Sequence, residues 1–119
     1  MKKRILVVDD DNMNLMRTRV ILGKEYDVLL AESGLEALNK LRYEDVDMVL
    51  LDIDMPKMNG IETFERMKSI TDDIPVIFLT ASGLEEDVVS AIKLGAVNYL
   101  KKPFFPEELL KRVAMGFEE

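Results

Sequence analysis

Five short apolar runs alternate along the chain with segments in which apolar residues recur every three or four positions. The runs are Ile5–Val8, Tyr26–Ala31, about Val46–Asp52, Ile74–Thr80 and Ala96–Lys101. Continuous apolar runs of this length are typical of strands that are buried on both faces, as in a parallel sheet covered by helices. The alternation therefore predicts five βα units that form a doubly wound α/β domain.

The segments after the runs have the apolar spacing of amphipathic helices. For the first three helices, the predicted core-facing stripes are Met13/Met16/Val20, Leu35/Leu38/Leu41 and Ile61/Phe64/Met67. The first helix is expected to stop near Gly23, and Ser33-x-x-Glu36 is a capping box that opens the second.

Two further helices are predicted near the end of the chain. The fourth carries acids in its first turn and closes at Gly95; its marker residues are Glu85, Glu86, Asp87, Val88, Ala91 and Ile92. The last helix begins at Pro106 with Glu107 and Glu108, and it carries Leu109, Leu110, Val113 and Phe117.

Polar residues stand where the predicted strands end. These are Asp9-Asp10, Asp52 with Asp54, Thr80, and Lys101-Lys102. In an open α/β sheet the carboxyl ends of parallel strands share one edge, and ligands bind there. Each pair of carboxylates about 4 Å apart repels by roughly 4 kcal/mol, so a bare cluster of acids would be unstable. The pattern therefore predicts a site that contains a compensating charge.

Composition narrows the chemistry that such a site could support. The 119 residues suit one domain, and the formal net charge of −7 argues against a nucleic-acid surface. The chain has no cysteine and no histidine, which excludes disulfides, Cys nucleophiles, Ser-His-Asp triads and a phosphohistidine donor. The first apolar run is too short for a signal peptide, and no transmembrane span is apparent, so we expect a cytoplasmic location.

Hard oxygen ligands at this edge suit Mg²⁺, which binds one or two carboxylates, waters and phosphate oxygens. Lys102 would add a positive charge and Thr80 a hydroxyl donor for a phosphoryl group. This set favours transfer of a phosphoryl group onto an aspartate. Each residue also has a purely structural interpretation: Asp11 or Asn12 can cap a helix, Asp52 can be satisfied by backbone donors, and the lysines can be a solvated strand end. Their joint occurrence at four strand ends favours a site.

The ordered motifs resemble those of response-regulator receiver domains, the CheY-like family of two-component signalling. The resemblance covers Ile5 to Phe117 and rests on Val-Val-Asp9-Asp10, Leu-Leu-Asp52-x-x-Met-Pro56-x-Met-x-Gly60, Leu-Thr80-Ala81, Gly95-Ala96 and Tyr99-Leu-x-Lys102-Pro103-Phe104. It implies a single (βα)5 domain over residues 1–119, with strand order 2-1-3-4-5 and no output domain within the chain.

The resemblance also implies a role for each motif residue. Asp52 would be the phosphoacceptor, Asp10 a direct metal ligand, and Asp9 would hold the metal or its water. Asp54 would offer its backbone carbonyl to Mg²⁺, for which Mn²⁺ or Ca²⁺ can substitute. Thr80 and Lys102 would hold the phosphoryl group, Tyr99 would turn inward when Thr80 moves, and Lys102-Pro103 would be a cis peptide.

The implied function is a switch that takes its phosphoryl group from a histidine kinase or a histidine phosphotransfer protein. It would signal through the face formed by the last two helices and the fifth strand, toward an effector protein or a fused output domain. The switch would catalyse its own phosphorylation and dephosphorylation without turning over an external substrate. The domain itself would bind neither nucleic acid nor membrane, and it would be a monomer or a phosphorylation-dependent dimer.

Two differences from the usual pattern matter. The side chain of Asp54 adds negative charge beside the site, so we expect stronger dependence on divalent metal than in an Asp54→Asn variant. Val97-Asn98 stands where the winged-helix branch of the family usually has an acidic pair, so the particular dimer contacts of that branch are not expected here.

Other functions fit the same residues less well. Asp52-Ile-Asp54 resembles the acid pair of haloacid-dehalogenase-type phosphatases, but there the pair ends the first strand of a longer chain. A flavodoxin-like binding module would need a Gly/Ser/Thr-rich phosphate loop after the first strand. An EF-hand fails because Pro56 occupies its fifth position. A phosphorylation-independent adaptor would not need the intact acidic set.

Overall fold

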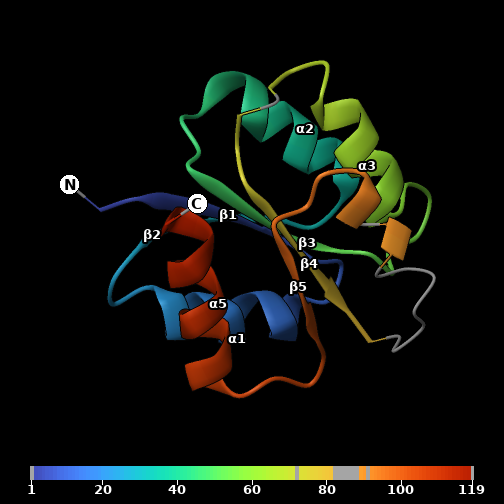
Figure 1. The fold of residues 1–119 in the computed structure, drawn as a ribbon. Helices are drawn as coiled ribbons and strands as arrows, with labels where there is room; N and C mark the ends of the chain where they lie inside the picture. Colours follow the sequence, from blue (N-terminus) through green and yellow to red (C-terminus); the bar gives the residue numbers. More distant parts are fainter. Residues whose placement is uncertain (1, 72, 82–88, 91, 119) are drawn as a thin grey trace.

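Five parallel strands form one sheet in the computed structural model, which describes residues 2–71, 73–81, 89–90 and 92–118 (Figure 1). The strands are β1 (Arg4–Val8), β2 (Asp27–Ala31), β3 (Met48–Asp52), β4 (Val76–Thr80) and β5 (Asn98–Lys101). Their order across the sheet is β2-β1-β3-β4-β5, and every neighbouring pair is parallel. The predicted doubly wound α/β fold is therefore confirmed, although β2, β3, β4 and β5 begin one or two residues later than expected.

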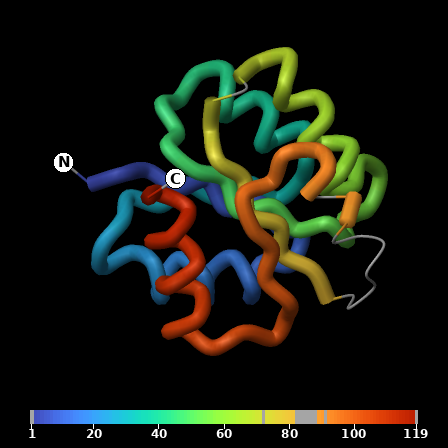
Figure 2. The backbone as a smooth tube through the Cα atoms, viewed as in Figure 1, coloured from blue at the N-terminus to red at the C-terminus, as the bar shows by residue number. Residues whose placement is uncertain are grey.

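Helices cover both faces of the sheet. The bounded helices of the described part are α1 (Asn12–Leu22), α2 (Gly34–Tyr43), α3 (Gly60–Met67) and α5 (Pro106–Glu118). Figures 1 and 2 show α1 and α5 on one face and α2 and α3 on the other. Most of the fourth predicted helix, including Glu85, Glu86, Asp87, Val88 and Ala91, lies outside the described residues. Among the described helices, none is long and apolar enough to cross a membrane.

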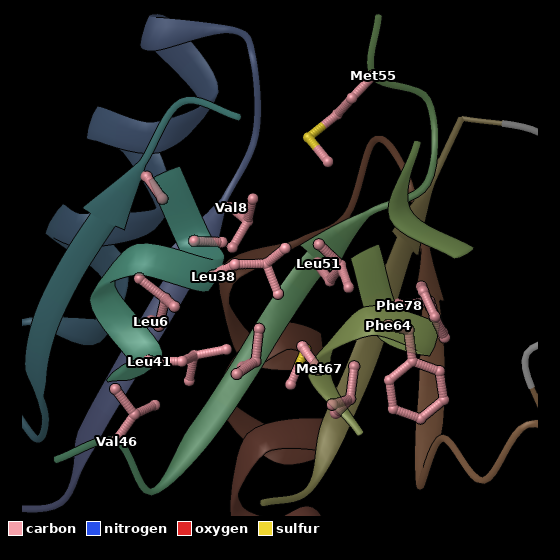
Figure 3. Packing of buried hydrophobic residues seen from close by; sticks show 14 of the residues in the cluster. Leu6, Val8, Leu38, Leu41, Val46, Leu51, Met55, Phe64, Met67 and Phe78 are labelled. Carbon is pink, nitrogen blue, oxygen red and sulfur yellow. The ribbon is translucent and has the colours of Figure 1, made fainter. Parts of the chain in front are cut away.

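Alternation along each strand divides the core into two layers. In β1, Leu6 and Val8 pack toward α2 and α3, whereas Ile5 and Val7 pack toward α1 and α5. Figure 3 shows the first layer, where Leu6, Val8 and Leu51 meet side chains from α2 and α3. The rings of Phe64 and Phe78 meet there edge to face, with centroids 5.4 Å apart. Burial on both faces explains the continuous apolar runs of the central strands β1, β3 and β4, whereas the edge strands β2 and β5 carry exposed residues.

The stripe predicted for α1 is wrong. Met13, Met16 and Val20 are 81%, 53% and 72% exposed, and the buried residues of this helix are Leu15, Thr18 and Leu22. Helix α1 has apolar residues on two sides, and the side that contains Thr18 faces the sheet. A stripe sought only among apolar residues therefore selects the wrong face.

The other described helices largely follow their predicted stripes. Ala37, Leu38 and Leu41 are buried in α2, but Leu35 is 63% exposed. The Ser33 side chain accepts a bond from the Glu36 backbone N–H, while the Glu36 carboxylate lies 3.8 Å from Lys40 Nζ instead of capping in return. In α3, Phe64 and Met67 are buried, and a full capping box joins Asn59 and Glu62.

Helix ends also match their sequence signals. Gly23 caps α1, and Gly95 has a φ of +106°, a left-handed conformation that glycine adopts without strain. Pro106 begins α5, which buries Leu109 and Val113. The Lys102-Pro103 peptide bond is cis, as predicted.

Candidate functional site

Two aspartates lie side by side at the carboxyl edge of the sheet because their strands are paired in register. Asp52 is the last residue of β3, and Asp9 follows β1 directly. Val8 of β1 is the register partner of Leu51 of β3, so the next residues of the two strands are neighbours. Asp9 and Asp52 are only 2% and 3% exposed. The fold thus buries two carboxylates at adjacent strand ends.

Asp10 completes a cluster of three acids. One carboxylate oxygen each of Asp9, Asp10 and Asp52 lies within 4.8 Å of the others, and Asp10 is exposed. Like charges at this separation repel strongly where solvent is scarce. The cluster therefore needs positive charge nearby.

Lys102 supplies one positive charge to this cluster. Its Nζ lies 2.7 Å from Asp9 Oδ2 and 3.4 Å from Asp52 Oδ2. The Lys102 backbone N–H donates to the Thr80 carbonyl at 2.7 Å, which fixes the residue just beyond β5. One lysine thus bridges two of the three acids.

The environment shifts the pKa of both partners. Burial raises the pKa of Asp52 to about 6, and the Asp9 charge adds to this rise, while Lys102 and the Asp54 N–H oppose it. Burial alone would lower the pKa of Lys102, but its bonds to Asp9 and Asp52 outweigh that effect and raise it. Lys102 is therefore cationic at neutral pH, next to a carboxylate that is costly to ionise.

Backbone donors orient the two buried carboxylates. The Asp11 N–H donates to Asp9 Oδ1 at 2.9 Å, and the Asp54 N–H donates to Asp52 Oδ1 at 3.2 Å. Asp11 also caps α1, since its side chain accepts from the Met13 N–H. In both buried acids, Oδ1 is held by the backbone and Oδ2 faces Lys102.

The loop between β3 and α3 shapes the other side of the site. The carbonyl of Ile53 accepts bonds from the N–H groups of both Met55 and Gly60, at 3.1 Å and 3.0 Å. A Cβ at position 60 would collide with the Asp52 carbonyl oxygen, so only glycine fits there. Asp54 is exposed within this loop. Lys57 adopts a φ of +68°, which is unusual for a residue with a side chain.

Thr80 and Tyr99 lie on the strands beyond Asp52. Thr80 ends β4 and is fully buried, and its β4 neighbour Leu79 is the register partner of Asp52. Tyr99 lies in β5 and is 36% exposed. Arg112 of α5 donates to the Tyr99 carbonyl at 3.2 Å and to the Asn98 side chain at 2.7 Å. The predicted inward turn of Tyr99 stays a prediction.

The donor set fits Mg²⁺. Asp9, Asp10 and Asp52 offer carboxylate oxygens in one place, and hard oxygen ligands are what this cation prefers. The three acids exceed the single lysine in charge, so a divalent cation would also reduce their repulsion.

A family model described as the response regulator receiver domain matches residues 5–114 of the chain. The chain belongs to this receiver-domain family. Receiver domains are switches of two-component signal transduction and do not turn over substrates in the manner of metabolic enzymes. The three aspartates that the structure brings together form the type of acidic cluster at which receiver domains bind Mg²⁺.

Known receiver domains share the fold of this one. A CheY-like receiver domain protein from Methanospirillum hungatei has a TM-score of 0.93 and 33% identity, with 99% of this chain and 95% of that chain covered. DrrB of Thermotoga maritima, an OmpR/PhoB homolog, has a TM-score of 0.89 and 34% identity, with 99% and 54% covered. Both the family model and the similarity to solved structures therefore support the receiver-domain fold.

Relatives in sequence are longer than this receiver domain. The transcriptional regulatory protein CpxR homolog of Haemophilus influenzae is 42% identical over 113 residues, which are 95% of this chain and 49% of the relative. The chain spans about half the length of the curated relatives that it matches.

One contact of this receiver domain was not expected from the sequence. Arg17 of α1 donates from Nη2 to the Phe104 carbonyl at 2.9 Å. The two residues are 87 positions apart, and nothing in either local pattern points to the other. Only the packing of α1 beside the segment after β5 brings them together.

Proposed function

We propose that this domain is a phosphorylation-controlled switch in which Asp52 accepts a phosphoryl group from a phosphohistidine of a histidine kinase or a histidine phosphotransfer protein. The observation that carries the proposal is the meeting of a buried Asp52 with two further acids and a bridging lysine at one sheet edge. A purely structural acid would not need this excess of negative charge.

The residues divide the chemistry among them. An oxygen of Asp52 attacks phosphorus in line, the new O–P bond forms as the P–N bond to the imidazole breaks, and the imidazole leaves. Lys102 Nζ, already 3.4 Å from Asp52 Oδ2, then pairs with a phosphoryl oxygen. The Thr80 hydroxyl donates to another, from a neighbouring strand end.

Asp9, Asp10 and Asp52 would hold Mg²⁺ through their side chains, and Asp54 through its backbone carbonyl. The cation would neutralise charge on the phosphoryl oxygens. Water later hydrolyses the aspartyl phosphate, so the domain limits the lifetime of its own signal.

Phosphorylation would then shift the population between two packings of the domain. Thr80 moves toward the phosphoryl group, Tyr99 turns inward, and the face that contains β5 and α5 presents the change to a partner. Most of the fourth predicted helix, which we assign to the same face, lies outside the described residues.

We assign residues 1–119 to one receiver domain, in a cytoplasmic signalling protein. The longer relatives include two named as transcriptional regulatory proteins, which supports a fused output domain or a separate effector as the downstream partner. The net charge of −7 disfavours nucleic-acid binding by the domain itself.

Acetyl phosphate with Mg²⁺ tests the central claim. Intact-mass spectrometry should show the addition of one phosphoryl group, stable in acid and labile in base, that maps to Asp52. Asp52→Asn should remove the adduct, while Asp45→Asn, an exposed aspartate at the opposite edge, should not. An unlabelled wild-type protein, or a label that persists in Asp52→Asn, contradicts the proposal.

Mg²⁺ titration tests the metal ligands separately. We expect Asp10→Asn to weaken Mg²⁺ binding by roughly tenfold or more, as loss of a charged ligand does. Asp54→Asn should weaken it less, because this residue contributes charge without direct coordination by its side chain. Equal affinities for wild type and Asp54→Asn would show that the Asp54 charge has no influence on the site.

A further inference from the structure

Arg17 joins helix α1 to residues 102–104, the segment that follows β5. Its Nη2 donates to the Phe104 carbonyl at 2.9 Å, and its guanidinium carbon lies 5.4 Å from the centroid of the Phe104 ring. The same residue is thus held through a charge-assisted hydrogen bond and a cation–π contact. Both contacts end on one residue of the segment.

This contact connects the two parts of the chain that form the Lys102–Asp9 ion pair. Helix α1 begins directly after Asp9, Asp10 and the cap residue Asp11. Phe104 lies two residues beyond Lys102, whose own N–H is anchored to the Thr80 carbonyl. Arg17 therefore fixes the segment on the side of Lys102 that the sheet does not hold.

A pocket beside residues 102–104 leaves room in which this segment could move without the Arg17 contact. A cavity of about 270 Å³ separates part of α1 from the segment, and Asn14, Arg17, Thr18, Pro103 and Phe104 are among its lining residues. Asp9 and Lys102 line it as well. Phe104 is buried in the same core layer as Leu15, but the pocket leaves residues 102–104 without full contact along α1, so the segment could shift if the arginine were removed.

We propose that Arg17 is a positioning residue for phosphoryl transfer, an inference that rests on the function proposed above. By holding Phe104 against α1, it keeps Lys102 Nζ between Asp9 and Asp52, where the phosphoryl group would arrive. Arg17 itself touches none of these three side chains in the described contacts, so it acts through the backbone of the segment.

The test compares Arg17→Ala, Arg17→Lys and Arg19→Ala, each with Mg²⁺ and acetyl phosphate. Arg19 is an exposed arginine on the same helix and serves as the matched charge control. We expect Arg17→Ala to lower the initial labelling rate about tenfold, the rate equivalent of one charge-assisted hydrogen bond. Arg17→Lys, which keeps one donor and the charge over the ring, should recover most of the rate, and Arg19→Ala should match wild type.

A loss of stability must be separated from a loss of positioning. Phe117→Leu disturbs the Tyr26–Phe117 ring contact, which involves none of the proposed site residues, and should lower stability without changing the rate at a temperature where the protein is folded. The Mg²⁺ affinity of Arg17→Ala should equal or exceed that of wild type, since a displaced Lys102 competes less for Asp9. A structural loosening of the acids would weaken Mg²⁺ binding instead.

The outcomes distinguish this inference from the proposed function. Absence of labelling in the wild type contradicts the proposed function. Labelling of Arg17→Ala at the wild-type rate overturns the positioning role and leaves the function standing. The positioning role is also overturned if Phe117→Leu slows labelling as much as Arg17→Ala, or if Arg17→Ala binds Mg²⁺ more weakly.

Discussion

The two edges of the sheet each gather acids around one basic residue, yet they differ in burial. At the amino edge, Arg4 pairs with Asp27 at 3.1 Å and Glu44 at 3.3 Å, and these side chains are 34% to 53% exposed. At the carboxyl edge, Lys102 pairs with Asp9 and Asp52, and these side chains are 3% to 17% exposed. A basic residue paired with two acids thus occurs at both edges, exposed to solvent at the amino edge and buried at the carboxyl edge.

Burial changes what the two groups can do. Water and salt screen exposed ion pairs, so the contacts of Arg4 link chain segments but contribute little to the free energy of unfolding. Buried charges lose hydration and interact strongly with one another. Removing one partner therefore leaves an uncompensated buried charge, which strongly destabilises the folded state. The carboxyl edge is therefore the edge that can respond to an added cation or phosphoryl group.

The largest expected effect is from Lys102→Met. The variant leaves Asp9 and Asp52 buried without their cation, so we expect the free energy of unfolding at pH 7 without Mg²⁺ to fall by about 3 kcal/mol. Urea unfolding measures this change, and added Mg²⁺ should recover part of it. Lys101→Met, at the exposed neighbouring position, is the control, and an equal loss there would remove the distinction between buried and exposed lysines.

Asp52→Asn should produce an effect of similar size and opposite sign. The folded-state pKa of Asp52 is about 6, above its ordinary value of 3.8, so the folded protein binds this proton more tightly than the unfolded chain. Stability from this group is therefore lost as pH rises from about 4 to about 6, and Asn removes that loss. We expect the variant to be more stable by about 3 kcal/mol at pH 7 and little different at pH 4.

Thermal or urea unfolding across this pH range provides the measurement. Asp27→Asn, at the exposed edge, is the control measured under the same conditions. A constant difference between Asp52→Asn and wild type across the range would mean that the Asp52 carboxylate is not destabilising in the folded state.

Arg4→Met should give the smallest change. Its exposed pairs with Asp27 and Glu44 are expected to contribute about 1 kcal/mol or less, and high salt should reduce the difference from wild type. The backbone N–H of residue 4 would still donate to Asp47 Oδ2, so β1 stays anchored. If Arg4→Met lost more than about 2 kcal/mol of unfolding free energy independently of salt, the exposed ion pairs would stabilise the fold as strongly as the buried ones, contrary to the comparison.

The central strands β1, β3 and β4 could be predicted because both of their faces are buried. In Met48–Asp52 every residue is buried, so the apolar run is continuous and its end at Asp52 is sharp. Parallel pairing then places the ends of successive strands at one edge without further information. This is why the approach of Asp9, Asp10 and Asp52 followed from the sequence alone.

The orientation of α1 could not be predicted in the same way. Leu15, Thr18 and Leu22 have helical spacing, but Thr18 is polar and hides the stripe from a search for apolar residues. Met13, Met16 and Val20 offer a more hydrophobic alternative on the other side. The choice between the two faces depends on how the helix meets the sheet.

Part of the site also depends on distant contacts. The sequence indicated Lys102 as a partner for a phosphoryl oxygen, while its present partners, Asp9 and Asp52, come from other strands. The Arg17–Phe104 contact spans 87 positions and carries no local signal. Such pairs require the three-dimensional packing of the chain.

The loop after Asp52 is closed by a single carbonyl oxygen, that of Ile53, which accepts hydrogen bonds from the N–H groups of Met55 near its start and Gly60 at its end. Gly60 also packs directly against the Asp52 carbonyl. Within the loop, Met55 and Met58 are buried in the core, and the Asp54 N–H donates to Asp52 Oδ1. Residues 54–59 are thus anchored at both ends and in the middle, so an insertion or deletion here would disturb the core packing and the Asp52 carboxylate together.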